Sequence, residues 1–300
     1  MSVTIKRILE ISNKSYLRVE HQQLKVEQNG EVVSTVPLED VGTILLNHPA
    51  IVLSMRVLQL CAEKNVVVIT CDPQHSPSAL NLPLWDAHSL HSKVLSDQIR
   101  LNSKRAGQLW KLIVREKLLQ QSLTLERFKL KSLGVRRYRE RVTIGDKANI
   151  EAHAARLYWR TLFGPDFRRD RTVEGVNTLL NYGYGVFRAA LARAVVGTGL
   201  HPSLGLHHTN QYNSFNLVDD LIEPFRPWVD EIVMIMQSTG QSNLDSQDTK
   251  RQLLGLVSGD CFWKNEKLPI EVALQRYLSH FKKLLTSDER VFMFPQRYES

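Results

Sequence analysis

Two acidic residues in the second half of the chain have a spacing that could support metal or acid–base chemistry. Asp220 and Glu223 are three residues apart, so they share one face of a helix predicted within residues 213–224, beside a stripe of apolar side chains. Two acids beside such a stripe repel each other and are costly to desolvate unless a cation compensates them. An acidic surface patch, or acids paired with Arg226, would produce the same pattern.

Two other segments supply groups of the same kind. His207 and His208 end a Gly-Leu-His-His turn just before this helix, and imidazole is both a common metal ligand and a common acid–base group. Glu151 lies near the start of a helix predicted over residues 147–163, where the helix dipole alone would also favour an acid. Each segment alone is compatible with a structural role. Together, carboxylates and an imidazole suit Mg²⁺ or Mn²⁺ better than a structural zinc.

The positive charge of the chain is concentrated in one segment. The formal net charge is +8, and residues 104–141 contain twelve basic and three acidic residues, so the rest of the chain is nearly neutral. Such a segment can follow a nucleic-acid backbone, because each neutralised phosphate releases condensed counter-ions. A solvated helix face is the alternative. A divalent metal beside this segment would indicate phosphodiester chemistry.

Composition limits the class of protein. Hydrophobic residues make up 43% and charged residues 23% of the 300 residues, which is typical of a soluble globular protein with one large or two modest domains. Three scattered cysteines without a Cys-x-x-Cys pair exclude a disulfide framework and a zinc finger. No apolar run is long enough to span a bilayer and residues 1–20 lack a signal-peptide core, so we expect a cytoplasmic protein without a membrane partner.

Two kinds of secondary structure divide the chain. Residues 1–72 are predicted to be β-rich, with a hairpin turning at Asn29-Gly30 between strands 24–28 and 31–36. Turn-forming residues over 73–95 indicate a linker. Residues 96–300 have helical periodicity. The other predicted elements are strands at 43–46 and 65–71, a short helix within 50–63, and helices at 97–131, 147–163, 172–196, 213–224, 228–238, 246–258 and 268–286.

Four blocks of the helical half form a more specific signature. They are Glu-Ala-His-Ala-Ala-Arg-Leu-Tyr-Trp at 151–159, Leu-Asn-Tyr-Gly-Tyr-Gly at 180–185, Gly-Leu-His-Pro-Ser-Leu-Gly-Leu-His-His at 199–208 and Asp-Leu-Ile-Glu-Pro-Phe-Arg-Pro at 220–227. In this order and spacing they resemble the CRISPR-associated spacer-acquisition integrases, the "Cas-one" family. The β-rich start is similar to that family as well, and the length and residues 219–226 look like the compact form that accompanies single-effector (type II) CRISPR systems.

The resemblance implies an α+β fold, with an N-terminal β-sandwich-like domain that forms a homodimer and an all-helical C-terminal domain. It also implies that two such dimers flank a central dimer of the small "Cas-two" partner subunit. The complex would insert short double-stranded DNA fragments into a CRISPR repeat array. In that reaction the 3′-hydroxyl of the incoming DNA attacks a repeat phosphodiester, with a divalent metal at the site.

Carried over to matching positions, the resemblance implies that Glu151, His208 and Glu223 are the catalytic ligands of Mg²⁺ or Mn²⁺. The histidine falls on His208 rather than on His207. Asp220 is a weaker candidate, because some relatives use an acid at that position near the metal. No departure from the family pattern removes a ligand.

Five residues are candidates for DNA contacts. Arg136, Arg137 and Arg139 belong to the basic segment. Arg156 could neighbour Glu151 on its helix or bind a phosphate, and Tyr184 could lie beside the scissile phosphate or pack between helices.

Two other functions are compatible with the same features. A non-enzymatic DNA-binding or architectural protein would keep the basic segment without needing the three ligands. A general metal-dependent nuclease would cleave DNA without joining ends. A serine hydrolase is excluded, because the sequence has no Gly-x-Ser-x-Gly motif. The missing phosphate-binding loop of ATPases agrees with strand exchange, which forms one phosphodiester for each that it breaks.

Overall fold

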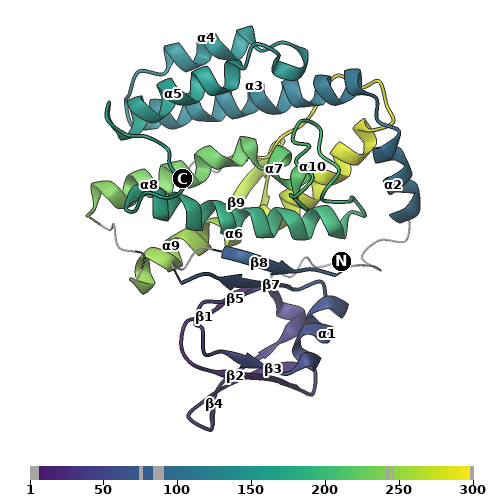
Figure 1. Ribbon diagram of the computed structural model, residues 1–300, viewed down its shortest axis with the longest axis vertical. Coiled ribbons are helices and arrows are strands. Elements are labelled where there is room, and N and C mark those ends of the chain that lie inside the picture. Colours follow the sequence, from purple (N-terminus) through teal and green to yellow (C-terminus); the bar gives the residue numbers. More distant parts are fainter. Residues whose placement is uncertain (1–6, 74–76, 84–90, 241–243, 245, 298–300) are drawn as a thin grey trace.

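The computed structural model describes residues 7–73, 77–83, 91–240, 244 and 246–297. A β-rich region and a helical region follow each other along the chain and pack together (Figure 1). One hydrophobic core fills the β-rich region, and a second fills the helical region and reaches one sheet at Leu45, Val67 and Ile69. The fold is α+β, as the sequence predicted. Among the described residues, no helix is long and apolar enough to cross a membrane.

Two four-stranded sheets and one helix make up the β-rich region. Its elements are β1 (Arg7–Ile11), β2 (Tyr16–Glu20), β3 (Gln23–Gln28), β4 (Glu31–Pro37), η1 (Leu38–Asp40), β5 (Val41–Leu46), β6 (Val52–Leu53), α1 (Met55–Glu63), β7 (Val67–Cys71) and β8 (Pro77–Asn81). The sheets have the orders β1-β5-β7-β8 and β4-β3-β2-β6, and apolar residues of both share one core with α1. This is the sandwich-like arrangement expected. β5 is buried along its whole length, because it lies between β1 and β7.

The predicted hairpin is present, whereas the predicted linker 73–95 contains a strand. Asn29 and Gly30 both have positive φ, at 52° and 84°, and β3 pairs with β4 in antiparallel fashion, so the hairpin is confirmed. Within the predicted linker 73–95, β8 pairs with β7 and completes a sheet. Pro77 lacks an N–H, which an edge strand tolerates. Residues 74–76 and 84–90 of that range lie outside the described residues.

The rest of the chain is mainly helical. Its elements are α2 (His91–Ile99), α3 (Ser103–Arg127), α4 (Leu133–Arg141), η2 (Ile144–Asp146), α5 (Ile150–Phe163), α6 (Val176–Gly197), α7 (Asn216–Leu221), η3 (Glu223–Phe225), α8 (Arg226–Ser238), α9 (Gln247–Ser258), β9 (Asp260–Trp263), β10 (Glu266–Pro269), α10 (Ile270–Leu284) and β11 (Gln296–Arg297). α3, α4 and α5 lie together at the end of the molecule remote from the sandwich (Figure 1). α6 crosses the middle and contacts β7 and β8 on one side and α8, α9 and α10 elsewhere.

The helical region differs from the prediction at several points, and α4 lies where the sequence predicts no helix. The predicted helix 97–131 is broken between α2 and α3, where the Asn102 side chain accepts a hydrogen bond from the backbone N–H of Arg105 at 2.8 Å and so caps α3. The region is also not all-helical, because β10, β9 and β11 form a small antiparallel sheet. The β9–β10 turn has positive φ at Lys264 rather than at a glycine, so this hairpin has no strong local signal in the sequence.

Close packing of α6 on α8 holds the centre of the helical region together. A Cβ built at Gly183 of α6 would lie 2.5 Å from Cγ1 of Val229 in α8 and 3.3 Å from Cδ2 of Leu253 in α9. Gly255 of α9 is exposed and a Cβ there would meet nothing within 4 Å. Both glycines lie inside helices, but an added methyl group would clash at Gly183 and would meet no other atom at Gly255.

We expect Gly183→Ala to destabilise the protein by up to about 2 kcal/mol, because overpacking costs about 1–3 kcal/mol and alanine returns about 1 kcal/mol of helix propensity. Gly255→Ala should instead stabilise it by up to about 1 kcal/mol. Equilibrium urea unfolding of both variants measures the difference. Equal free energies of unfolding for the two variants would contradict the packing assigned to Gly183.

Candidate active site

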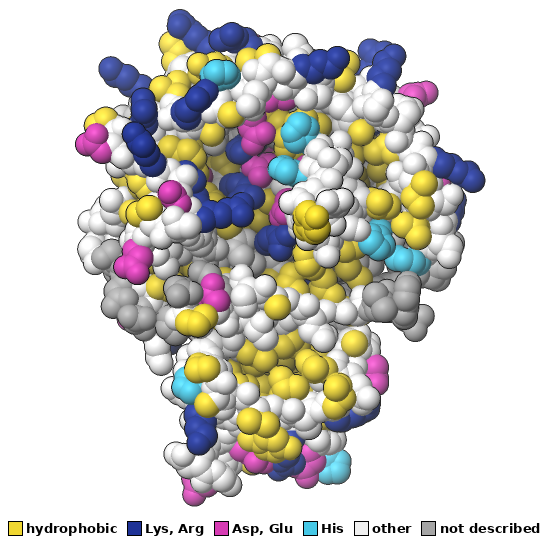
Figure 2. Space-filling model, viewed as in Figure 1, with side chains coloured by type: hydrophobic (Ala, Val, Ile, Leu, Met, Phe, Trp, Pro, Cys, Tyr) yellow, Lys and Arg dark blue, Asp and Glu magenta, His cyan; other side chains and the backbone are white. Residues whose placement is uncertain are grey.

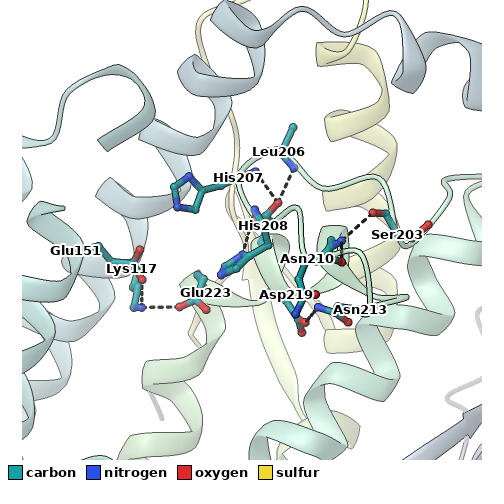
Figure 3. Close-up of polar contacts among 12 residues, drawn as sticks. Lys117, Glu151, Ser203, Leu206, His207, His208, Asn210, Asn213, Asp219 and Glu223 are labelled. Carbon is teal, nitrogen blue, oxygen red and sulfur yellow. Dashed lines mark hydrogen bonds and ion pairs between the residues drawn. The ribbon is translucent and has the colours of Figure 1, made fainter. Parts of the chain in front are cut away.

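A buried carboxylate holds the histidine loop in place. Asp220 of α7 is completely buried, and its Oδ2 accepts hydrogen bonds from the backbone N–H of Leu206 at 2.5 Å and of His207 at 3.0 Å. Its Oδ1 accepts the backbone N–H of His208 at 3.2 Å and lies 2.6 Å from Nδ1 of the His208 ring. Both oxygens of Asp220 are thus used to shape the loop and to orient the ring, which leaves Nε2 of His208 as the ring nitrogen for a ligand (Figure 3).

The two histidines have different surroundings. The His207 ring stacks on Trp110 of α3 with 4.4 Å between centroids, whereas His208 meets Trp110 edge-on at 5.9 Å. The His208 side chain remains 46% exposed, so it is accessible to a ligand. A Cβ at Gly205 would lie 2.3 Å from the carbonyl oxygen of His208, so only glycine fits at the start of this turn. The ring of His208 is thus oriented by Asp220 and that of His207 by Trp110, a residue that the sequence did not single out, and the choice of His208 as a ligand stays a prediction.

Two glutamates from separate elements converge on one lysine. Glu151 lies in the first turn of α5, where Asp146 caps the helix by accepting the backbone N–H groups of Ile150 at 3.0 Å and Glu151 at 2.9 Å. Glu223 begins η3, just after α7. Nζ of Lys117, from α3, is 2.5 Å from Oε1 of Glu151 and 2.5 Å from Oε2 of Glu223 (Figure 3). The predicted carboxylates are therefore close together, and a buried ammonium lies between them.

Neighbouring charges hold Glu223 and Lys117 in their charged forms at neutral pH. Burial alone would raise the pKa of Glu223, but Arg226 and Lys117 outweigh burial and lower that pKa to about 2. Nε of Arg226 donates to Oε1 of Glu223 at 2.7 Å. Burial would lower the pKa of Lys117, but Glu151 and Glu223 outweigh it and raise that pKa. The hydrogen bond that the His208 ring donates to Asp220 raises the pKa of His208, and burial opposes it only in part.

The oxygen and nitrogen donors of Glu151, Glu223 and His208 are of the kind that a hard divalent cation prefers, but the three side chains do not surround a common point. In the part of the chain that the structure describes, no three His, Cys, Asp or Glu side chains form a ready-made cation site. Between Glu151 and Glu223 lies the ammonium of Lys117. That ammonium marks a position where positive charge is favoured. Two carboxylates at such a position, with the His208 imidazole on the Glu223 side, have the chemistry that suits Mg²⁺ or Mn²⁺.

Tyr184 contacts the cluster through Arg226 and Asp230. Its buried hydroxyl donates to Asp230, which also accepts from the Tyr158 hydroxyl at 2.9 Å. Burial raises the pKa of Asp230 to about 7, despite the hydrogen bonds from Tyr184 and Tyr158. The Arg226 guanidinium lies 4.8 Å from the centroid of the Tyr184 ring, so the ring helps to hold the arginine that binds Glu223. The predicted contact of Tyr184 with a phosphate stays a prediction.

A large cavity opens beside this cluster. Its volume is about 810 Å³, and its lining includes Tyr184 and the guanidinium groups of Arg169, Arg171, Arg188 and Arg226. On the face shown in Figure 2, basic, acidic and histidine side chains gather in a hollow of the helical region. Arg188 is paired with Asp219, whereas neither Arg169 nor Arg171 forms an ion pair with a described residue. Sequence reasoning missed these arginines, because they lie outside the basic segment 104–141.

The predicted DNA-binding arginines lie away from the cavity lining, on α4 and α5. Arg136 is paired with Glu126 at 3.1 Å, and Arg139 contacts Glu140 at 2.9 Å. Arg137 is exposed, and Nη2 of Arg156 is 2.8 Å from Nδ1 of His153. One basic residue of the segment, Lys117, is buried instead of facing solvent. Nothing in these contacts tests DNA binding, so the assignments stay predictions.

Comparisons with known proteins agree on one family. The family model described as "CRISPR associated protein Cas1" matches residues 9–257. The CRISPR-associated endonuclease Cas1 of Neisseria meningitidis serogroup C (strain 8013) is 34% identical over 291 residues, which is 96% of this chain and 90% of that protein.

Solved structures show the same fold at low sequence identity. A casposase bound to an integration product is 17% identical with a TM-score of 0.79, over 95% of this chain and 91% of that chain. A chain of a Cas6-RT-Cas1–Cas2 complex is 16% identical with a TM-score of 0.79, over 100% of this chain and 37% of that chain.

Asp220→Asn should lower the pKa of His208, because a neutral amide no longer favours the protonated imidazole as the carboxylate does. The ring resonances of His208, followed by NMR from acid to neutral pH, measure this change. Asp166→Asn, at an exposed position, is the control and should leave the titration unchanged. An unaltered pKa of His208 in Asp220→Asn would show that Asp220 does not orient this ring in solution.

Proposed function

Because the chain belongs to the CRISPR-associated Cas1 family, we propose that it is a divalent-metal-dependent DNA endonuclease and integrase. In this proposal, the 3′-hydroxyl of a short DNA fragment attacks a phosphodiester of a CRISPR repeat. One P–O bond forms to the incoming strand while the P–O bond to the leaving strand breaks. The observation that carries the proposal is the convergence of Glu151 and Glu223, from separate segments, on the ammonium of Lys117, with the charge of Glu223 close enough to His208 to raise the pKa of its ring.

Glu151, Glu223 and Nε2 of His208 would hold Mg²⁺ or Mn²⁺. When bound, such a cation would supply charge stabilisation for the phosphoryl oxygens and the leaving oxygen. The protein's own groups position these ligands. Asp220 fixes the ring of His208, and Arg226 fixes Glu223 through its Oε1. Fixed ligands avoid a reorganisation cost during the reaction, which is the usual source of electrostatic catalysis.

The arginine-lined cavity gives the DNA backbone a place beside these ligands. Arg169 is held by the side-chain oxygens of Asn177 at 2.9 Å and Asn181 at 2.6 Å, which orient the guanidinium without neutralising it. Arg171 lines the same cavity and is exposed. Such guanidinium groups can bind a phosphate with two parallel hydrogen bonds. DNA bound here would be recognised through its backbone rather than its sequence.

The proposed assembly has two further levels. One structural neighbour is a chain of a complex that contains Cas2, and we propose that this chain also assembles with a small Cas2-type subunit. We further propose a homodimer through the β-rich region. There, Tyr16 of β2 pairs with Val52 of β6, and both side chains are exposed together with Met55. An exposed apolar patch on a sheet edge is a common feature of a protein interface.

Removing the charge of either glutamate tests the reaction. Glu151→Gln and Glu223→Gln should each lower strand joining by on the order of 100-fold or more, since the proposed metal contributes several kcal/mol. Purified variants, a Cas2-type subunit, labelled duplex DNA and a repeat-containing plasmid with Mn²⁺ provide the assay. Glu39→Gln, on the β-rich region, is the matched control. EDTA should abolish joining by the wild type.

The same assay separates the alternatives. DNA binding should persist in Glu151→Gln and Glu223→Gln, which shows that they are folded. Full joining by both variants would contradict the proposed ligands. Binding without joining or cutting by the wild type would favour an architectural protein, and cutting without joining would favour a general nuclease.

Arg171→Ala should weaken DNA binding and reduce the salt dependence of the binding constant, with its log–log slope smaller by roughly 0.7–0.9 for one lost phosphate contact. Arg137→Ala tests the predicted α4 surface in the same way. Fluorescence anisotropy of labelled DNA over a range of salt concentrations gives the slopes, with exposed Arg251→Ala as the control. A slope equal to that of the wild type would remove the substituted arginine from the DNA surface.

A further inference from the structure

Lys117 is placed unlike the other lysines of the basic segment. It projects from the long helix α3 into the protein, and its side chain is only 10% exposed. Its ammonium bridges Glu151 of α5 and Glu223 of η3, which are 72 residues apart in the sequence. Among the described residues, Lys117 is the only cation paired with Glu151.

The bridge compensates a pair of acids that would otherwise repel. Two carboxylates placed within reach of one ammonium raise each other's energy, and removing one partner of a buried ion pair is costly. The two oxygens that contact the ammonium are Oε1 of Glu151 and Oε2 of Glu223, one on each side of Nζ. Any other cation that binds both carboxylates at this place must use them.

An ammonium and a divalent cation cannot share this place. A protonated lysine has three donors and no lone pair, so it cannot act as a ligand, and two cations at ligand distance repel strongly in a buried site. The second oxygen of Glu223 is held differently. Its Oε1 accepts from Arg226, whose guanidinium lies over the Tyr184 ring. Glu223 therefore keeps an anchor if Lys117 leaves.

We propose that Lys117 is an internal counter-ion that holds Glu151 and Glu223 together in the metal-free protein and competes with a divalent cation for them. This inference rests on the proposed function, since it takes the two glutamates as metal ligands. In this proposal, Lys117 and Arg226 have different roles. Arg226 positions Glu223 throughout, whereas the ammonium of Lys117 occupies the cation position until a divalent ion displaces it.

Metal binding to the protein without DNA tests the competition directly. Lys117→Met should bind Mn²⁺ about tenfold tighter or more than the wild type in calorimetry, because the cation no longer displaces a bound ammonium. Lys111→Met, on the same helix and without an ion pair among the described residues, is the matched control and should bind like the wild type. Equal or weaker binding by Lys117→Met would overturn the proposal.

Two further measurements test the proposal even if Lys117→Met folds poorly. In EDTA, Lys117→Met should melt at a lower temperature than the wild type, and Mn²⁺ should raise its melting temperature by more. In the wild-type protein, the Nζ resonance of Lys117 in NMR should change as Mg²⁺ is added and should reach saturation together with metal binding. An Nζ resonance that stays constant while Mg²⁺ binds would overturn the proposal without any variant.

These outcomes separate the inference from the proposed function. If neither the wild type nor Lys117→Met binds Mn²⁺, the proposed metal site fails and the inference fails with it. If both bind Mn²⁺ with the same affinity and Glu223→Gln abolishes binding, the metal site stands and only the competition fails. Tight binding by Lys117→Met alone would support the competition most strongly.

Discussion

The ion cluster of Glu151, Lys117 and Glu223 is the constraint on which the candidate site depends. Two carboxylates lie next to each other, Glu223 buried and Glu151 with 23% of its side chain exposed, and like charges this close are tolerated only with compensating cations. Lys117 and Arg226 supply that compensation from α3 and α8, so three helices and η3 must keep their relative positions for the cluster to exist. The proposed cation site rests on these two carboxylates and on the two basic side chains that hold them.

The surrounding fold serves to keep these charges in place. α6 runs through the middle of the helical region, where Gly183 permits close contact with α8 and Tyr184 supports Arg226. α7 carries Asp220, whose two oxygens shape the loop that ends at His208. The same helices line the arginine-rich cavity. The proposed ligands and the proposed DNA surface therefore lie on one packed set of helices, which the sandwich region joins through the contacts of α6 with β7 and β8.

Sequence reasoning succeeds where a local signal exists. The hairpin at Asn29-Gly30 rests on short-range chemistry that the structure reproduces, because both residues have positive φ and β3 pairs with β4. It fails where a partner is distant. Nothing near Lys117 in the sequence shows that it turns inward to residues 34 and 106 positions away, and Trp110 contacts the histidines only through the fold. The strand at 77–81 carries turn-forming residues, and only pairing with β7 makes it part of a sheet.

The central claim is that a divalent cation takes the place held by the Lys117 ammonium. Crystals of the wild-type protein soaked in Mn²⁺ would locate it by anomalous scattering. We predict one strong peak between Glu151 and Glu223, with Nε2 of His208 at ligand distance and the Lys117 side chain moved away. A peak at another site, or an ammonium of Lys117 still bridging both glutamates in the Mn²⁺-bound protein, would contradict this claim.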